Sequence, residues 1–371
     1  MPTSVEIQDF ALWDKMKAKR ALFSFDLELT ARCNLDCRHC YINLPANDRA
    51  AQGRELTLPE IARIAAQAVE LGALWCLITG GEPFLRDDFA DVYLMLKRKG
   101  LLVSVFTNAT TIRAEHIALF KKYPPRDIEV TIYGVTRETY EAVTRRPGSF
   151  AAFVRGLDML FDAGVRVRLK AMALRSNLAE MEAIAAFGLA RTKDFYRFDP
   201  QLHLRFDGDA TRNEEIKQER LTPQEIVALE RTDEKRFGAL QKNCDTLINE
   251  DFTHIGCDHL FHCGAGNGSF DVSYDGKFRL CSPLWHPETV YDLRKGTLAE
   301  AWHTLVPQVR DLRSHSREFL EKCRRCPLIN LCLWCPAHAH LETGELDGAV
   351  PYFCEVAHAR AEALKGIESG P

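Results

Sequence analysis

Three closely spaced cysteines constrain this chain more than any other feature. Cys33, Cys37 and Cys40 follow a Cys-x3-Cys-x2-Cys spacing. Three thiolates leave one iron of a cubane iron–sulfur cluster without a protein ligand, and such an iron can bind and activate a small molecule. Zinc is the alternative, but zinc sites prefer four ligands, and His39 is poorly placed inside the short loop between Cys37 and Cys40. The spacing therefore favours a cluster with an open iron.

The triad follows a predicted strand, and similar strands recur up to residue 200. Short apolar runs predict strands at 23–30, 74–79, 102–107, 128–133, 165–174 and 196–199. Amphipathic segments predict helices at 57–71, 87–99, 150–163 and 178–191, the first of them opened by a capping box. This alternation implies parallel strands with right-handed crossovers, in either an open doubly wound sheet or a partial (β/α) barrel.

The character of the sequence changes twice along the chain. Residues 1–22 are a short N-terminal extension, and residues 23–202 hold the alternating strands and helices. Residues 203–255 are charge-rich and then helical, which predicts a helical linker. Residues 256–371 are rich in glycine, turns and cysteine, with a hairpin predicted across 269–280. This last region has too little continuous apolar pattern for a large core, so we expect metal to hold it together.

Composition sets limits on partners and compartment. The formal net charge is −4, with no long block of one sign, which argues against a nucleic-acid partner. No window reaches the ~18 apolar residues of a membrane span, and the N-terminus lacks the apolar stretch of a signal peptide. We therefore expect a cytoplasmic protein. Of its 13 cysteines, Cys76 and Cys244 are predicted to be ordinary core thiols, and the odd total fits a disulfide framework poorly.

A second motif stands at the end of the next predicted strand. Residues 80–83 read Gly-Gly-Glu-Pro, and paired glycines let a backbone come close to a ligand. Together with the cysteine triad and a later strand ending in Thr107-Asn108, this motif resembles the radical S-adenosylmethionine (radical SAM) superfamily over about residues 20–200. The family fold is an α/β partial (β/α)6 TIM-type barrel, which would resolve the choice left open above.

The resemblance also implies cofactors. In the family, the open iron of a [4Fe–4S] cluster chelates S-adenosylmethionine, and an electron from the cluster cleaves it to methionine and a 5′-deoxyadenosyl radical that abstracts hydrogen from a substrate. An electron donor such as flavodoxin or ferredoxin is then an expected partner. The catalytic cluster would be held by Cys33, Cys37 and Cys40. The implied cofactor contacts are Tyr41, Gly80, Gly81, Glu82, Pro83, Thr107, Asn108, Thr131 and Lys170.

Eight further cysteines form an array in the last third of the chain. From spacing alone, the array fits two four-iron clusters or two zinc sites. It resembles the small cysteine-rich iron–sulfur SPASM domain that follows many radical SAM barrels, which implies two auxiliary [4Fe–4S] clusters. The array departs from the usual pattern in having two residues rather than three between Cys332 and Cys335. The implied ligands are Cys257, Cys263, Cys281 and Cys335 for the inner cluster, and Cys323, Cys326, Cys332 and Cys354 for the outer one.

The substrate is indicated less directly. The segments around Thr131 and Lys170, with Pro147-Gly148-Ser149-Phe150, resemble those of SPASM enzymes that modify ribosomally made peptides. A peptide substrate is therefore expected. The residues before the first strand are too few to fold alone as a leader-binding domain, so we expect either a separate leader-binding protein or direct recognition of a short peptide. Asp199 and His203 end the last barrel strand, together with Arg205, and are candidates for acid–base catalysis or substrate contact.

Other activities stay open at this stage. In sulfatase-maturing relatives, an aspartate that acts as a base stands where this chain has Ser282, which argues against that activity. A tetrapyrrole-modifying SPASM enzyme is the main alternative, and it would present cationic residues to propionates. Its candidate residues are Arg166, Arg168, Arg197 and Arg205. A non-enzymatic metal carrier is a third reading, but a carrier does not need an open iron.

Overall fold

A curved sheet of parallel strands forms the centre of the computed structural model, which describes residues 21–192, 194, 196–248 and 257–365. Its six barrel strands pair side by side in the order β1-β4-β5-β6-β7-β8, each parallel to the next. Their bounds are β1 Ser24–Thr30, β4 Trp75–Gly80, β5 Leu102–Thr107, β6 Asp127–Ile132, β7 Val167–Met172 and β8 Tyr196–Asp199. The predicted partial barrel is confirmed, and its strands are those expected from the apolar runs.

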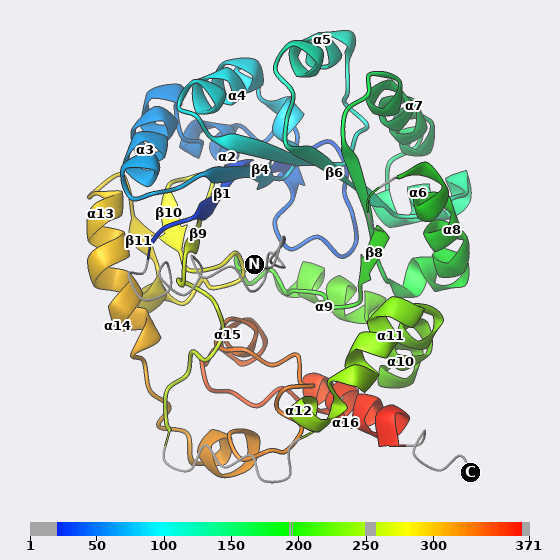
Figure 1. Ribbon diagram of the computed structural model, residues 1–371, viewed down its shortest axis with the longest axis vertical. Coiled ribbons are helices and arrows are strands. Elements are labelled where there is room, and N and C mark those ends of the chain that lie inside the picture. The colour runs from blue at the N-terminus through cyan, green and yellow to red at the C-terminus, as the bar shows by residue number, and fades with distance from the viewer. Residues whose placement is uncertain (1–20, 193, 195, 249–256, 366–371) are drawn as a thin grey trace, which may run out of the picture.

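Helices cover the outside of this sheet (Figure 1). Their bounds are α3 Leu58–Glu70, α4 Phe89–Arg98, α5 Ala114–Lys122, α6 Arg137–Thr144, α7 Ser149–Asp162 and α8 Met181–Arg191. The predicted capping box of α3 is present, because Thr57 and Glu60 satisfy each other's backbone N–H groups. Helices α5 and α6 are not among those predicted from the sequence. Helix α6 is largely polar (RETYEAVT), and only a few of its residues are buried.

After β1 the chain enters a short second sheet, which flanks the loop that carries the three cysteines. Strand β2 (Arg32–Cys33) pairs in parallel with β3 (Leu44–Pro45), so the triad loop is closed at its base. Helix α2 (Arg49–Arg54) follows directly. This pairing fixes both ends of the loop that carries the three cysteines.

The predicted linker is helical, and it packs against the end of the chain. Its helices are α9 Ala210–Glu219, α10 Pro223–Thr232, α11 Glu234–Lys242 and α12 Cys244–Leu247. Helix α16 (Pro351–Lys365) lies against α10, and Arg360 donates hydrogen bonds to both oxygens of Glu230 at 2.6 and 3.0 Å. Both side chains are buried, so this ion pair ties the C-terminal helix to the linker.

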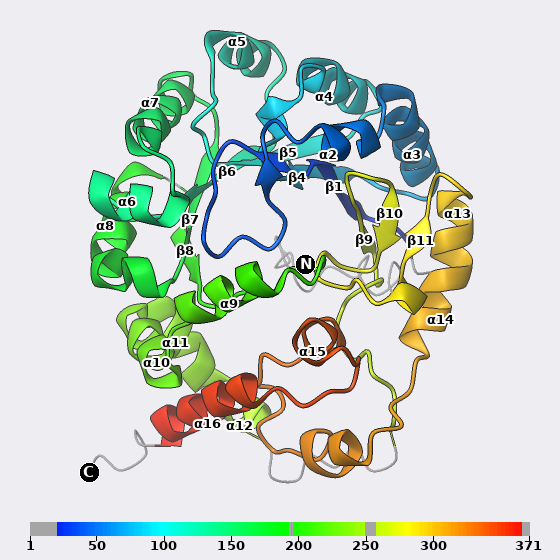
Figure 2. The same cartoon turned by 180° about the vertical axis from the view of Figure 1, so that it is seen from behind.

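Beyond the linker, the chain returns to the barrel and extends its sheet (Figure 2). Strand β9 (Ser269–Val272) runs parallel to β1, and β10 (Lys277–Arg279) and β11 (Tyr291–Asp292) follow in antiparallel order. The predicted hairpin is thereby confirmed. The remaining helices of this region are α13 Leu298–Glu300, α14 Val306–Arg310 and α15 Pro336–Thr343.

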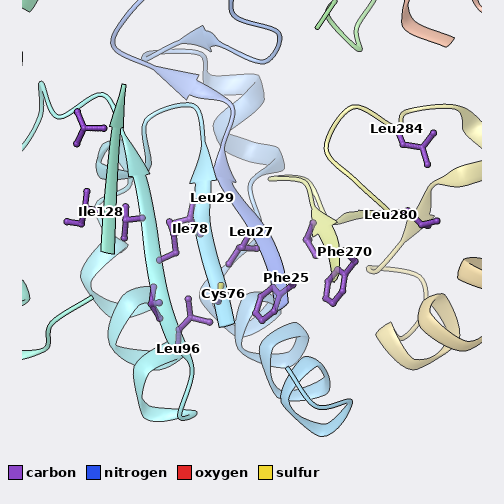
Figure 3. Packing of buried hydrophobic residues seen from close by; sticks show 14 of the residues in the cluster. Phe25, Leu27, Leu29, Cys76, Ile78, Leu96, Ile128, Phe270, Leu280 and Leu284 are labelled. Carbon is purple, nitrogen blue, oxygen red and sulfur yellow. The ribbon is translucent and has the colours of Figure 1, made fainter. Parts of the chain in front are cut away.

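One hydrophobic core runs through the barrel and the returning strands. Phe25 on β1 and Phe270 on β9 stack with ring centroids 5.5 Å apart, and Figure 3 shows them beside Cys76 and Ile78 of β4. Cys76 is fully buried there, which confirms the predicted core thiol. The C-terminal region therefore adds its apolar residues to the barrel core instead of building a separate large one, which is why its own apolar pattern is thin.

Most of the predicted extension 1–22, and the predicted junction between 255 and 256, lie outside the described residues. Among the helices that the structure describes, none is both long and apolar enough to cross a bilayer.

A close helix contact yields a test of the fold. A Cβ on Gly156 of α7 would lie 1.9 Å from the carbonyl oxygen of Ala109, in the loop after β5. We expect Gly156→Ala to lower the free energy of unfolding by about 1–3 kcal/mol, because that loop must shift to make room. Gly238→Ala is the matched control, since no atom lies within 4 Å of its added Cβ and alanine favours the helix. Thermal unfolding followed by circular dichroism measures both, and equal melting temperatures would contradict the packing described here.

Candidate active site

A cavity of about 290 Å³ inside the barrel collects most of the predicted site residues. Strands β1, β4, β5, β6, β7 and β8, the triad loop and β9 all contribute to its lining. The predicted residues that line it are Cys33, Cys37, Cys40, Tyr41, Gly80, Gly81, Thr107, Asn108, Thr131, Lys170, Asp199 and His203. Residues up to 170 positions apart thus converge because parallel strands end at the same edge of the sheet.

The triad loop is held from two sides. The backbone N–H of Arg38 donates to the carbonyl of Val143 at 3.2 Å, which fastens the loop to the end of α6. From α9, the Arg212 guanidinium donates to the carbonyl of Cys37 at 3.0 Å. Arg205 also braces the loop: it donates to the Asn43 carbonyl at 3.2 Å and pairs with Asp207. Arg205 is buried and does not line the cavity, so its position differs from that expected of a substrate contact.

The three thiols form a donor set that fits a cluster. All face one cavity, and burial raises the pKa of each thiol, so binding iron must expel their protons. Asn108 lies with its amide nitrogen 3.7 Å from the Cys33 sulfur, and this places a hydrogen-bond donor beside the predicted cluster. Three sulfur donors on one wall leave room for a small molecule at a fourth position.

The two glycines after β4 are needed for a contact within the chain. Gly80 has φ +118°, and a Cβ there would lie 2.3 Å from the Thr30 carbonyl oxygen. A Cβ on Gly81 would lie 2.2 Å from the carbonyl oxygen of Arg32. The backbone of this turn therefore passes directly over the end of β1, where the triad begins. The paired glycines set the distance between the Gly-Gly-Glu-Pro turn and the triad loop.

Glu82 is buried under the cavity wall. Its carboxylate accepts hydrogen bonds from the Thr107 hydroxyl at 2.9 Å, the Asn108 backbone N–H at 2.9 Å and the Phe84 N–H at 3.3 Å. Burial raises the pKa of this carboxyl to about 7. Neither Glu82 nor Pro83 is among the described residues that line the cavity. In this arrangement Glu82 positions Thr107 and Asn108, and these two residues line the cavity.

Thr131 and Lys170 face each other as register partners on β6 and β7. The Lys170 ammonium lies 2.8 Å from a Glu129 oxygen and 4.0 Å from the centre of the Phe106 ring. Burial lowers the pKa of this ammonium while Glu129 opposes the shift. Among the described residues, Lys170 is the only lysine that lines the cavity, and it is already paired.

Asp199 and His203 line the far wall beside the C-terminal region. Asp199 accepts a hydrogen bond from the Gln201 N–H at 3.0 Å. The His203 ring lies 4.5 Å from the ring of His338, whose backbone N–H lies 3.5 Å from the Cys335 sulfur. The ring contact and this backbone N–H thus join the cavity to a predicted auxiliary ligand. Burial lowers the pKa of His203 to about 3, so the ring is neutral at physiological pH.

Carboxylates on β1 and β9 form the part of the site that the sequence analysis missed. Asp26, Glu28 and Asp271 all line the cavity. Glu28 pairs with Arg279 at 2.8 Å, and both side chains are buried. The signal was present in FDLEL, where two acidic residues alternate within an apolar strand and must share one face.

The predicted outer auxiliary ligands come together. Cys323, Cys326, Cys332 and Cys354 all line a second cavity of about 350 Å³ with mostly apolar walls. Segments thirty residues apart therefore meet at one place, as a bridging metal centre requires. The donor set, four thiols around one cavity, fits a fully ligated cluster.

The predicted inner ligands are partly assembled. Burial raises the pKa of Cys281, and the nearby thiols of Cys335 and Cys263 add to the shift, so these three are neighbours. Cys257 lies with its sulfur 3.4 Å from His259 Nδ1, and that hydrogen bond lowers its pKa. Cys335 lies near Cys281 despite its short spacing from Cys332. Cys244, predicted to be a free thiol, packs beside the second hydrophobic cluster with Cys326 and Cys332.

Comparisons with known proteins identify two domains. The model of the radical SAM superfamily matches residues 27–188, and that of SPASM, an iron–sulfur cluster-binding domain, matches residues 263–327. A Methanosarcina barkeri protein named Fe-coproporphyrin III synthase is 26% identical over 330 residues, covering 82% of this chain and 80% of its own. The Bacillus subtilis antilisterial bacteriocin subtilosin biosynthesis protein AlbA is 31% identical over 159 residues, 43% of this chain and 35% of that protein.

Solved structures agree on the fold. Streptococcus suis SuiB, in its complex with the precursor peptide SuiA, superposes with a TM-score of 0.67 over 94% of this chain and 80% of its own, at 16% identity. At this level of identity, the similarity shows a common fold. S-adenosylmethionine and [4Fe–4S] clusters are the cofactors that the two domains bring. With a partial barrel, an open cysteine triad and a cysteine-rich extension of the same sheet, this chain belongs to the radical SAM enzymes that carry a SPASM domain.

Proposed function

We propose that this enzyme modifies a ribosomally synthesised peptide. When bound, S-adenosylmethionine and the triad cluster supply hydrogen-atom abstraction. The residues of the chain bind the substrate, exclude water and hold its reacting carbon near the cofactor. The charge of the cavity carries the proposal, because it suits a neutral or cationic substrate better than a polyanionic one.

The cavity lining contains four carboxylates and one ammonium. Asp26, Glu28, Asp199 and Asp271 face it, whereas Lys170 is its only lysine or arginine among the described residues. A tetrapyrrole carries several propionates, which would meet these carboxylates without cations to pair with. A peptide side chain brings no such charge requirement.

The arginines expected to bind a tetrapyrrole are engaged elsewhere. Arg197 and Arg168 approach Glu129 at 2.9 and 4.0 Å. Arg166 pairs with Asp194 at 2.7 Å, and Arg205 braces the triad loop. None of the four lines the cavity in the described part of the chain. The relative AlbA, named for bacteriocin biosynthesis, adds support over 159 residues.

The roles of the site residues follow from this proposal. Cys33, Cys37 and Cys40 ligate the catalytic cluster, while Tyr41, Gly80, Gly81, Thr107, Asn108, Thr131 and Lys170 contact S-adenosylmethionine. Glu82 and Pro83 act from behind by fixing Thr107 and Asn108. Asp199 and His203 face the substrate. Electrons come from a flavodoxin- or ferredoxin-type donor, and a separate protein presents the peptide leader.

Tetrapyrrole modification is the second candidate, since the Fe-coproporphyrin III synthase matches most of this chain. Anaerobic incubation of the reconstituted enzyme with S-adenosylmethionine, dithionite and the short peptides encoded beside it separates the two. We expect a change in peptide mass, absent from a Cys33→Ala control. Iron coproporphyrin is added in a parallel reaction. Cofactor cleavage with unchanged peptides and an altered tetrapyrrole mass would overturn the peptide proposal.

Iron content tests the proposed auxiliary ligands. The intact protein should hold roughly twelve iron per chain, as three four-iron clusters. We expect Cys354→Ala to lose about four iron, because it opens the outer site. Cys244→Ala, a cysteine of the neighbouring hydrophobic cluster, should keep the full content. Loss of iron from the Cys244 variant, or full content in the Cys354 variant, would contradict the assignment.

A further inference from the structure

We propose that Asp26 and Asp271 form a recognition site for a cationic side chain of the substrate, an ammonium or a guanidinium. This inference rests on the proposed function and names the substrate group that the cavity selects. The two carboxylates stand together on the cavity wall where the SPASM region joins the barrel.

The strand register brings the pair together. Asp26 of β1 and Asp271 of β9 are direct partners in a parallel pair, so their side chains emerge side by side on one face. Neighbouring strands lie about 4.8 Å apart, which places two carboxylates within reach of one cation. Glu28 follows two residues later on the same face.

Neither carboxylate has a partner of its own. The side chains of Asp26 and Asp271 form no hydrogen bond or ion pair with any residue that the structure describes, and Asp271 is only 8% exposed. Arg279, the register partner of Asp271 on β10, acts on both carboxylates only at longer range. A buried charge without a close partner is costly. Burial, reinforced by the other carboxylates, raises the pKa of Asp26 to about 6 and that of Asp271 well above its usual value. A substrate cation seated between the two carboxylates would offset this cost.

The nearby arginine is already committed. Arg279 is fully buried, pairs with Glu28 at 2.8 Å, donates to the Ser282 carbonyl and lies 3.9 Å from the centre of the Trp285 ring. Its positive charge lowers the pKa of both aspartates, but this single charge faces three carboxylates, those of Asp26, Glu28 and Asp271. The other titratable neighbours are Tyr41, Cys76, Cys281 and Asp275, which bring no cation.

The pair lies on different strands from most of the proposed cofactor contacts. Those contacts lie on the triad loop and at β4 to β7, and Tyr41 is the one that neighbours the pair, whereas Asp26 and Asp271 lie across β1 and β9. Leu77, the register partner of Asp26 on β4, also lines the cavity and offers apolar surface to the alkyl stem of a lysine or arginine. The cavity thus has a place for both the stem and the charge.

Matched small molecules test the site without a peptide. The reconstituted full-length enzyme, saturated with S-adenosylmethionine, is titrated anaerobically with butylguanidinium and with its neutral isostere butylurea, by calorimetry. We expect the cation to bind roughly 10- to 100-fold more tightly, as for hydrogen bonds to charged groups. Asp271→Asn and Asp26→Asn should each reduce this ratio at least about fivefold. Asp162→Asn, the same change at an exposed position on α7, should keep it.

The outcomes separate this inference from the proposed function. Equal binding of the two probes by the wild-type enzyme, including no detectable binding of either, overturns the cation site. An unchanged ratio in both aspartate variants overturns it as well. Modification of peptides without regard to lysine or arginine would leave the proposed function standing alone. A strong cation preference without any modified peptide would instead leave the site standing and remove the peptide proposal.

Discussion

The ion pair between Glu28 and Arg279 connects the two halves of this enzyme. It joins residues 251 positions apart at 2.8 Å, and both side chains are buried. A buried charge is tolerated only when it is paired. If β10 left the barrel, Glu28 would remain buried without its partner Arg279. With this pair in place, β9 adds to β1 and the SPASM strands extend the barrel sheet. The cavity wall then contains residues from both domains.

That shared wall explains how the cysteine sites relate to one another. The triad loop is fastened by α6 and by Arg212 of the linker, while His203 and His338 bridge from the cavity to Cys335. The proposed inner ligands Cys281 and Cys335 lie on segments that follow β10 and precede α15. Holding these segments against the barrel therefore sets the distance between the catalytic site and the inner auxiliary site.

Much of the fold could be predicted because its signals are local. Apolar runs marked all six barrel strands, and a turn sequence marked the β9–β10 hairpin. Some helices could not be predicted because contacts with distant parts of the chain stabilise them. Helix α6 is polar along most of its length, and α16 is stabilised by the ion pair of Arg360 with Glu230 in α10. At the site, motif spacing located the triad, whereas Asp26, Glu28 and Asp271 went unnoticed because each looks ordinary in its own strand.

The sequence by itself determined the chemistry: the Cys-x3-Cys-x2-Cys spacing, the Gly-Gly-Glu-Pro turn and the cysteine array are contiguous patterns whose meaning needs no partner. Only the tertiary structure decided the charge of the cavity. It showed Glu82 turned toward Thr107 and Asn108, Lys170 paired with Glu129, and Asp26 beside Asp271. The physical reason is that the effect of a charge depends on burial and on partners within a few ångströms, which strand register and chain return create.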